Sequence, residues 1–274
     1  MDPWARLHLI NRVLESAPLL PFATAWLRRR HIPRAFRPVY YYVAAEAFLY
    51  FLDRLSRITI HNNIYIHHLA TVLLVLFLTQ AYYRLLPQSR VQKAIRPSLY
   101  LFLVVAFVDA AFLNGLFSDI NTYSHSFGCA ILLTLAMIHI ARLTLESPLT
   151  PLEKQPGFFL SVATLVYCSC SIITYVARNV VYGLDYDLAT EIRLDIIVSV
   201  PDTFLFAVAM ALLAWMFSFF PLSTNPRRAL PKWLHYSRWQ QRPLRFLSQP
   251  FAKQPIESEL RHPEHSISVN EKNQ

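Results

Sequence analysis

Two aspartates lie on one apolar stretch in the last third of the chain, where a carboxyl group is costly. Asp195 and Asp202 are seven positions apart, about two helical turns, so a helix places both on one face. Pro201 precedes Asp202 and leaves the carbonyl of Ile197 without its helical partner. An acid at the centre of a membrane helix costs about 2.5–3.5 kcal/mol. The pair therefore needs a cationic partner, a bound proton or a water-filled cavity.

Further polar residues lie within or at the ends of the apolar stretches, toward the same side of a membrane. They are Asp109, Asn114, His67, His68, His125, Arg178 and Asn179. Ionisable residues inside a membrane indicate a functional site by default. Arg178 is the expected partner of Asp195 or Asp202, and it can also hold an anionic ligand group. Together these residues predict an outward-open polar pocket.

The same residues also fit a simpler hypothesis, in which a polar network only holds the helices together. His67 and His68 are adjacent and point about 100° apart on a helix, so they do not readily bind one metal ion. Glu46 and Asp53 share another helix face by their spacing. The sequence leaves both hypotheses open, although the proline before Asp202 favours function, because broken membrane helices often mark binding sites.

The composition is typical of a membrane protein. Hydrophobic residues occupy 54% of the 274 positions and charged residues only 16%, whereas about 25% of a soluble domain is charged. The net charge is +9, but lysine and arginine lie between and after the apolar stretches, as they do at membrane surfaces. We therefore expect membrane lipids as partners and no nucleic acid.

Seven apolar stretches predict helices that cross a bilayer core of ~30 Å. The expected spans are residues 7–27, 38–55, 63–86, 98–117, 123–145, 158–182 and 192–220. The first contains two charges and two prolines; we expect it to cross, and six spans would remain without it. The predicted fold class is all-α, a polytopic transmembrane bundle of seven helices. Residues 221–274 predict a basic cytoplasmic tail, largely disordered after residue 253.

The loops on the two sides differ in charge. Loops 28–37, 87–97 and 146–157 hold five, three and one basic residues, and the tail holds nine. The other side carries Asp119, Asp185, Asp187 and Glu191. Because basic loops stay in the cytoplasm, the N-terminus is expected outside and the C-terminus inside. We expect a multi-pass protein of the cell inner (plasma) membrane.

Familiar catalytic motifs are absent from the sequence, including HExxH, GxSxG, the P-loop and CxxC. Cys129, Cys168 and Cys170 all fall in apolar stretches and predict neither a disulfide nor a zinc site. We expect no cofactor and no bound metal, and a role other than catalysis is favoured.

Four motifs occur along the chain: HNNIYIHHLAT at 61–71, NTY at 121–123, PLTPLEKQPGFF at 148–159 and RN at 178–179. This set is similar to a family of uncharacterised, Bacteroidota-like, seven-span integral membrane proteins of unknown function. The likeness covers about residues 7–220 and implies a seven-helix protein of a bacterial inner membrane. In that family a glutamate often follows the position of Thr71, where this chain has Val72, Leu73 and Leu74.

These observations favour a protein that binds or senses a small or lipidic ligand in a polar outer-leaflet pocket; signalling would require a protein partner. One alternative is a proton-coupled or lipid transporter using Asp109, Asp195 and Asp202, although no internal repeat is detectable. The other alternative is an intramembrane metal-dependent hydrolase using His67, His125 and Asp202.

Overall fold

The computed structural model describes residues 3–146, 151–182, 184 and 187–222, and in these ranges the chain forms helices and no strand. The helices are α1 (Pro3–Leu14), α2 (Leu19–Arg28), α3 (Arg37–Thr59), α4 (Ile64–Leu85), α5 (Ser89–Val108), α6 (Thr122–Glu146), α7 (Pro156–Tyr182) and α8 (Leu188–Ser218). A π-helix, η1 (Asp109–Leu113), follows α5, and a short 3₁₀ turn, η2 (Leu152–Lys154), precedes α7. The predicted tail lies almost wholly outside the described residues.

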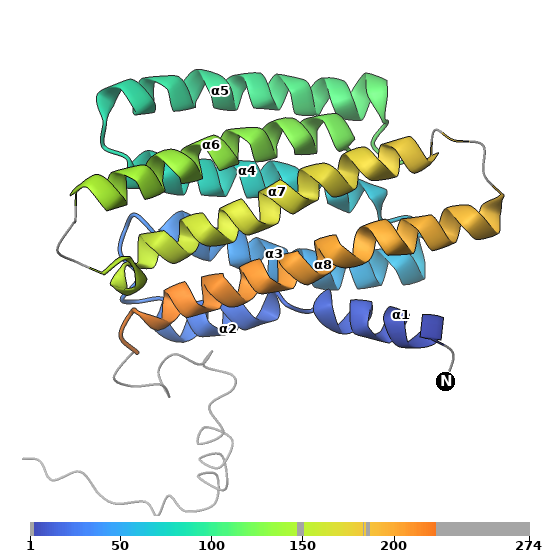
Figure 1. Cartoon of the computed structure of the whole chain (residues 1–274), viewed down its shortest axis with the longest axis horizontal. Coiled ribbons are helices and arrows are strands. Elements are labelled where there is room, and N and C mark those ends of the chain that lie inside the picture. Colours follow the sequence, from blue (N-terminus) through green and yellow to red (C-terminus); the bar gives the residue numbers. More distant parts are fainter. Residues whose placement is uncertain (1–2, 147–150, 183, 185–186, 223–274) are drawn as a thin grey trace, which may run out of the picture. The chain divides into compact units, whose positions relative to one another are not determined.

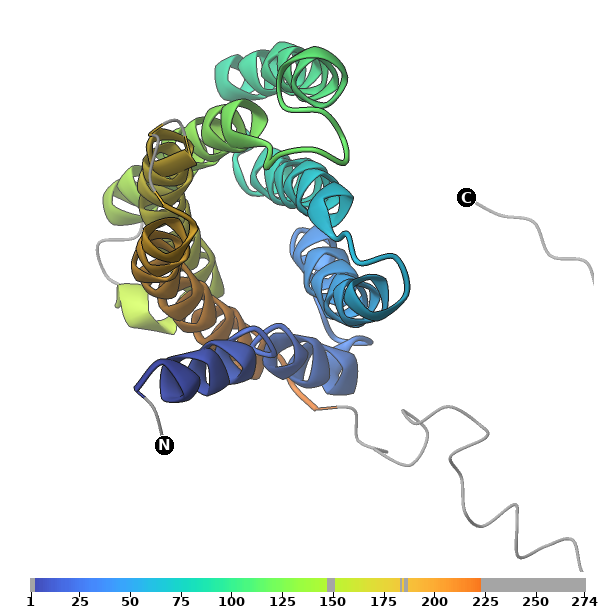
Figure 2. The same cartoon turned by 90° about the vertical axis from the view of Figure 1, so that its right-hand side faces the viewer.

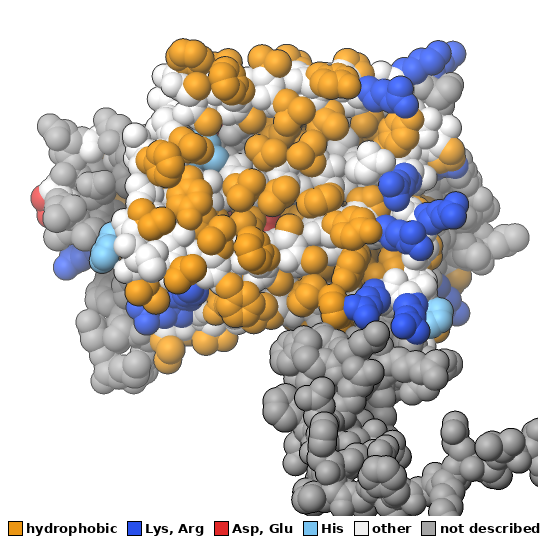
Figure 3. Space-filling view, turned by 180° about the vertical axis from the view of Figure 1, so that it is seen from behind, with side chains coloured by type: hydrophobic (Ala, Val, Ile, Leu, Met, Phe, Trp, Pro, Cys, Tyr) orange, Lys and Arg blue, Asp and Glu red, His pale blue; other side chains and the backbone are white. Residues whose placement is uncertain are grey.

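The long helices run side by side in a bundle (Figure 1). Among the described residues, five helices are long and apolar enough to cross a membrane: α4, α5 with η1, α6, α7 and α8. Hydrophobic side chains cover the middle of the face in Figure 3, and lysine and arginine line one edge. With α3, and with α1 and α2 as one broken rod, the structure confirms the predicted seven-helix transmembrane bundle.

The first predicted span is not continuous. α1 ends at Leu14 and α2 starts at Leu19, and both follow the same side of the bundle (Figure 1). Tight turns join them, with the amide of Ser16 donating to the carbonyl of Val13. Pro18 has no N–H to continue an α-helical ladder, which explains the break. Residues 7–27 therefore form two short helices and not the expected single one.

α5 begins at Ser89, before the expected start at residue 98, and continues through Pro97. Its polar first turns are held against α4. Gln92 Nε2 donates to the carbonyl oxygen of Tyr83 at 3.0 Å, and Arg96 Nη2 donates to the Tyr83 hydroxyl at 2.9 Å. These contacts explain why most of the expected loop 87–97 is helical despite its charge.

At the far end of α5 the helix widens to the π-helix η1, which starts at the buried Asp109. Asp109 Oδ2 accepts a hydrogen bond from the amide of Ser124 at 2.7 Å, and Oδ1 accepts one from Asn114 Nδ2 at 2.7 Å. Ser124 lies in the first turn of α6, where amides lack helical partners and negative charge is favoured. Asp109 therefore caps α6.

Seen end-on, the helices form a ring, with α5 outside it (Figure 2). α5 packs on α4 and α6, and α2 packs on both α3 and α8. We call the end where α2 stops and α3 begins, which carries Arg28, Arg30, Arg34 and Arg37, the basic end. Large side chains fill the ring in the basic half, among them the fully buried Tyr82, Met216 and Phe217.

Candidate functional site

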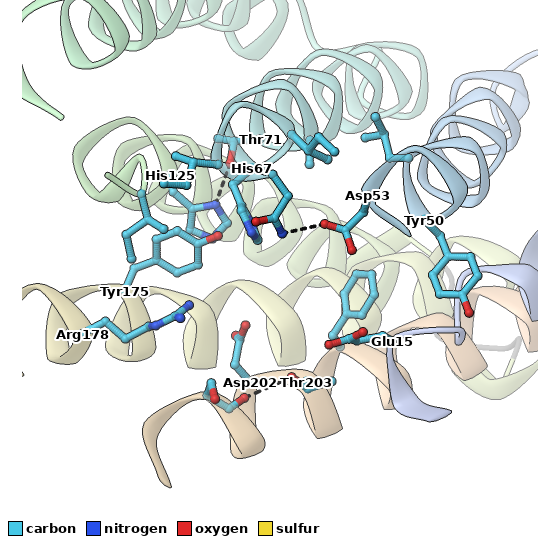
Figure 4. Close-up of a pocket in the computed structure, with 18 of the residues that line it drawn as sticks. Glu15, Tyr50, Asp53, His67, Thr71, His125, Tyr175, Arg178, Asp202 and Thr203 are labelled. Atoms are coloured by element: carbon cyan, nitrogen blue, oxygen red, sulfur yellow. Dashed lines mark hydrogen bonds between the residues drawn. The ribbon is translucent and has the colours of Figure 1, made fainter. Parts of the chain in front are cut away.

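A cavity of about 990 Å³ lies inside the ring, in the half away from the basic end. α1, α3, α4, α6, α7 and α8 all contribute to its wall, and residues 118–120 contribute near the end of the bundle. The lining extends inward as far as Leu74 of α4 and Phe206 of α8. Figure 4 shows labelled polar side chains from separate helices gathered around this space.

His125 of α6 is held on three sides at the cavity wall. Its Nδ1 is hydrogen-bonded to the hydroxyl of Thr71 in α4 at 2.9 Å (Figure 4), and its Nε2 to the hydroxyl of Ser171 in α7 at 2.7 Å. The ring of Tyr175 stacks on the imidazole with centroids 3.9 Å apart. Because both ring nitrogens and one ring face are engaged, the orientation of His125 is fixed by α4 and α7.

Arg178 of α7 pairs with Asp195 of α8, one of the two partners that the sequence predicts. Arg178 Nε donates to Asp195 Oδ1 at 2.7 Å. The two side chains are 21% and 27% exposed. The ion pair thus joins the last two helices at the cavity wall while remaining accessible from the cavity.

Two more ion pairs lie around α3. Asp53 accepts from Arg57 Nε at 2.9 Å and from Asn63 Nδ2 at 2.7 Å. Glu15, at the break between α1 and α2, accepts from Arg54 Nη2 at 2.8 Å. Glu15, Asp53 and Arg57 line the cavity. These pairs tie the first helix and the start of α4 to α3.

Two lining carboxyl groups, Glu46 of α3 and Asp202 of α8, differ from the others. Within the part of the chain that the structure describes, neither forms an ion pair, and Asp202 Oδ1 is buried without a hydrogen-bond partner. The Asp202 carboxyl approaches the hydroxyl of Ser171, the serine that also contacts His125. Negative charge and the His125 network therefore meet at one part of the wall.

The structure brings together five of the nine residues expected in the pocket and places four elsewhere. Those that line the cavity are His67, His125, Arg178, Asp195 and Asp202. Asp109 and Asn114 instead bind each other at the start of α6. His68 Nε2 contacts the carbonyl oxygen of Asp119 at 3.2 Å, and Asn179 is exposed near the end of α7.

Sequence reasoning left several wall residues out of the site. Glu46 and Asp53 carried a usable signal, because their helical spacing already placed them on one face. Thr71 follows His67 by one turn, and Tyr175 precedes Arg178 by nearly one turn, so each shares a face with a residue that was identified. No comparable signal marks Ser171, whose contact with His125 joins two different helices.

Among the described residues, no group of three or more histidine, cysteine, aspartate or glutamate side chains is placed to hold a metal ion. Comparison with protein-family models, curated proteins and solved structures finds no match to this chain. The similarity to a bacterial seven-span family therefore stays a prediction, and the site must be interpreted from its own geometry.

Proposed function

We propose that this protein binds a small or lipidic ligand in the cavity. The observation that carries the proposal is a space of about 990 Å³ with charged and hydroxyl groups on its wall, inside an apolar bundle. Small-molecule sites typically measure about 300–1,000 Å³ and combine apolar walls with a few oriented polar groups. Polar groups are costly inside a membrane unless they meet a partner or water, and a bound ligand can serve as a partner.

The packing between the cavity and the basic end supports binding of a ligand in preference to its passage through the bundle. A void on the side of the cavity toward the basic end, lined by Tyr42, Leu78 and Leu213, measures about 10 Å³. Such a space holds at most about one water molecule. The cavity therefore narrows toward the basic end to a space too small for a ligand. No observation favours the transporter or hydrolase alternatives over ligand binding.

The proposal places the protein in a bacterial inner membrane, with the N-terminus outside and the cavity in the outer half. The basic end supports this orientation, because positively charged loops remain in the cytoplasm. A partner protein would be needed to transmit a signal from the cavity.

The binding proposal can be tested by native mass spectrometry of the gently purified protein, with elemental analysis of the same sample. We expect a co-purified lipid or metabolite. Val200→Trp, at the cavity wall, should lower its occupancy, because the indole fills the space. Ile197→Trp is the matched control on the same helix, since Ile197 is 59% exposed on the bundle surface. Loss of the adduct in both variants, or bare protein throughout, would contradict the proposal, and stoichiometric metal would favour the hydrolase.

Orientation is tested by thiol labelling on intact spheroplasts. Asp187 precedes α8 and Arg30 follows α2, and both side chains are exposed. With an impermeant reagent, Asp187→Cys should react and Arg30→Cys should react only after lysis. The unmodified chain controls for the native cysteines. The reverse pattern would invert the proposed orientation.

A further inference from the structure

The cavity wall carries more negative than positive groups. Its six carboxyl residues are Glu15, Glu46, Asp53, Asp119, Asp195 and Asp202. Its three arginines are Arg12, Arg57 and Arg178. With histidines neutral, the formal charge of the lining is negative, although the whole chain is basic. The site therefore favours a cationic group over an anionic one.

The pairing of these groups sharpens the difference. Arg57 and Arg178 already bind Asp53 and Asp195, and Arg12 is exposed on α1. The arginines therefore offer little to an anionic ligand. Glu46 and Asp202, in contrast, form no ion pair with any described residue. They lie on α3 and α8, two helices that face each other across the ring (Figure 2).

Aromatic side chains of the same wall complement these two acids. Tyr167 and Tyr175 line the same cavity as Glu46 and Asp202. Tyr167 also packs on Phe206, with ring centroids 5.3 Å apart. Aromatic faces attract ammonium groups, and more strongly where water is excluded. The same bundle already uses this contact at Arg54, which lies over the ring of Tyr50.

We propose that the ligand carries a protonated alkylamine, with its ammonium group between Glu46 and Asp202 and against Tyr167 and Tyr175. This inference rests on the proposed function and names its ligand class. The ammonium supplies an ion pair to two carboxyl groups that have none among the described residues, and the alkyl part lies along apolar lining residues such as Leu74 and Phe206. A lipid headgroup and a free amine share this chemistry.

The test uses the full-length protein in nanodiscs of phosphatidylglycerol, a lipid without an amine, with calorimetric titration of hexylammonium, hexanol and hexanoate. We expect saturable binding of hexylammonium that is at least about tenfold tighter than binding of the other two probes. Glu46→Gln and Asp202→Asn should each weaken it at least about tenfold, because each removes a charged partner. Glu15→Gln is the matched control, since Glu15 lines the cavity but already binds Arg54. Competition by added phosphatidylethanolamine would identify a lipid amine, and its absence a free amine.

Hexanoate or hexanol binding as tightly as hexylammonium would overturn the ammonium assignment. Because this comparison uses the unmodified protein, it holds even if a variant fails to fold. If such binding were still lost in Val200→Trp, the binding function would stand without its charge preference. Binding of no probe, together with bare protein in native mass spectrometry, would overturn both proposals.

Discussion

α6 carries two buried histidines about four helical turns apart, one in each half of the bundle. His125 is hydrogen-bonded to Ser171 of α7. His139 is hydrogen-bonded through Nδ1 to Ser161, also of α7, at 2.8 Å. Each also has an aromatic neighbour, Tyr175 for His125 and Tyr82 for His139. The two sites share residue type, burial and a serine partner on α7, although His125 has a second hydrogen bond, to Thr71.

They differ in the space beside the ring. His125 borders the cavity. His139 fills its site so closely that a Cβ atom added at Gly157 would lie 2.7 Å from its Cε1 atom. A polar network in a membrane bundle can therefore serve packing in one half and line a cavity in the other, and neither residue type nor depth distinguishes them.

The largest effect is expected for His139→Ala, which should lower the unfolding free energy in detergent by about 2–4 kcal/mol. It empties a closely packed site and leaves Ser161 with one partner fewer. His125→Ala should cost less, because the wall beside it is already open. Equal losses in the two variants would remove the distinction between the halves.

Gly157→Ala should destabilise the protein by about 1–3 kcal/mol, because its methyl group overlaps the His139 ring. The same substitution in a His139→Ala background should cost much less, since the ring is gone. Equilibrium unfolding of the four proteins of this double-mutant cycle measures the difference. Additive losses would show that His139 does not limit the space at Gly157.

Ser161→Ala should cost about 1–2 kcal/mol and Ser171→Ala less than that. Both remove a hydroxyl bound to a histidine, but water in the cavity can replace the partner of His125, whereas the His139 ring is packed closely against Gly157. Thermal melting of the two variants side by side provides the comparison. A larger loss for Ser171→Ala would indicate a dry cavity wall.

The smallest effect on stability is expected at the Arg178–Asp195 pair, because both side chains are partly exposed. Arg178→Ala should lower the melting temperature, and adding Asp195→Ala should restore part of the loss, with a coupling energy of about 1 kcal/mol. The two single variants serve as the controls of the cycle. Strict additivity would show that the ion pair contributes no net stability.

The sequence predicted the fold well because long apolar stretches leave the chain few alternatives in a membrane. It also limited the partner of Arg178 to Asp195 or Asp202, because helical spacing and opposite charge leave few choices, and the structure selects Asp195. It did not distinguish Asp109 from Asp202. The difference arises from the π-helix, which directs Asp109 to the amide of Ser124. The cavity itself depends on how six helices leave space between them, and no local pattern encodes that space.

The ring also has an order of assembly. α1 and α2 are synthesised first, yet both pack on α8, the last helix described. Since chains fold as they emerge from the ribosome, α2 can pack on α3 at once, but the contacts of α1 and α2 with α8 must wait for the five helices between them. The Asp195 and Asp202 carboxyl groups arrive with that same helix. The cavity is therefore the last feature of the bundle to form, and a chain interrupted before α8 has membrane helices but no enclosed site.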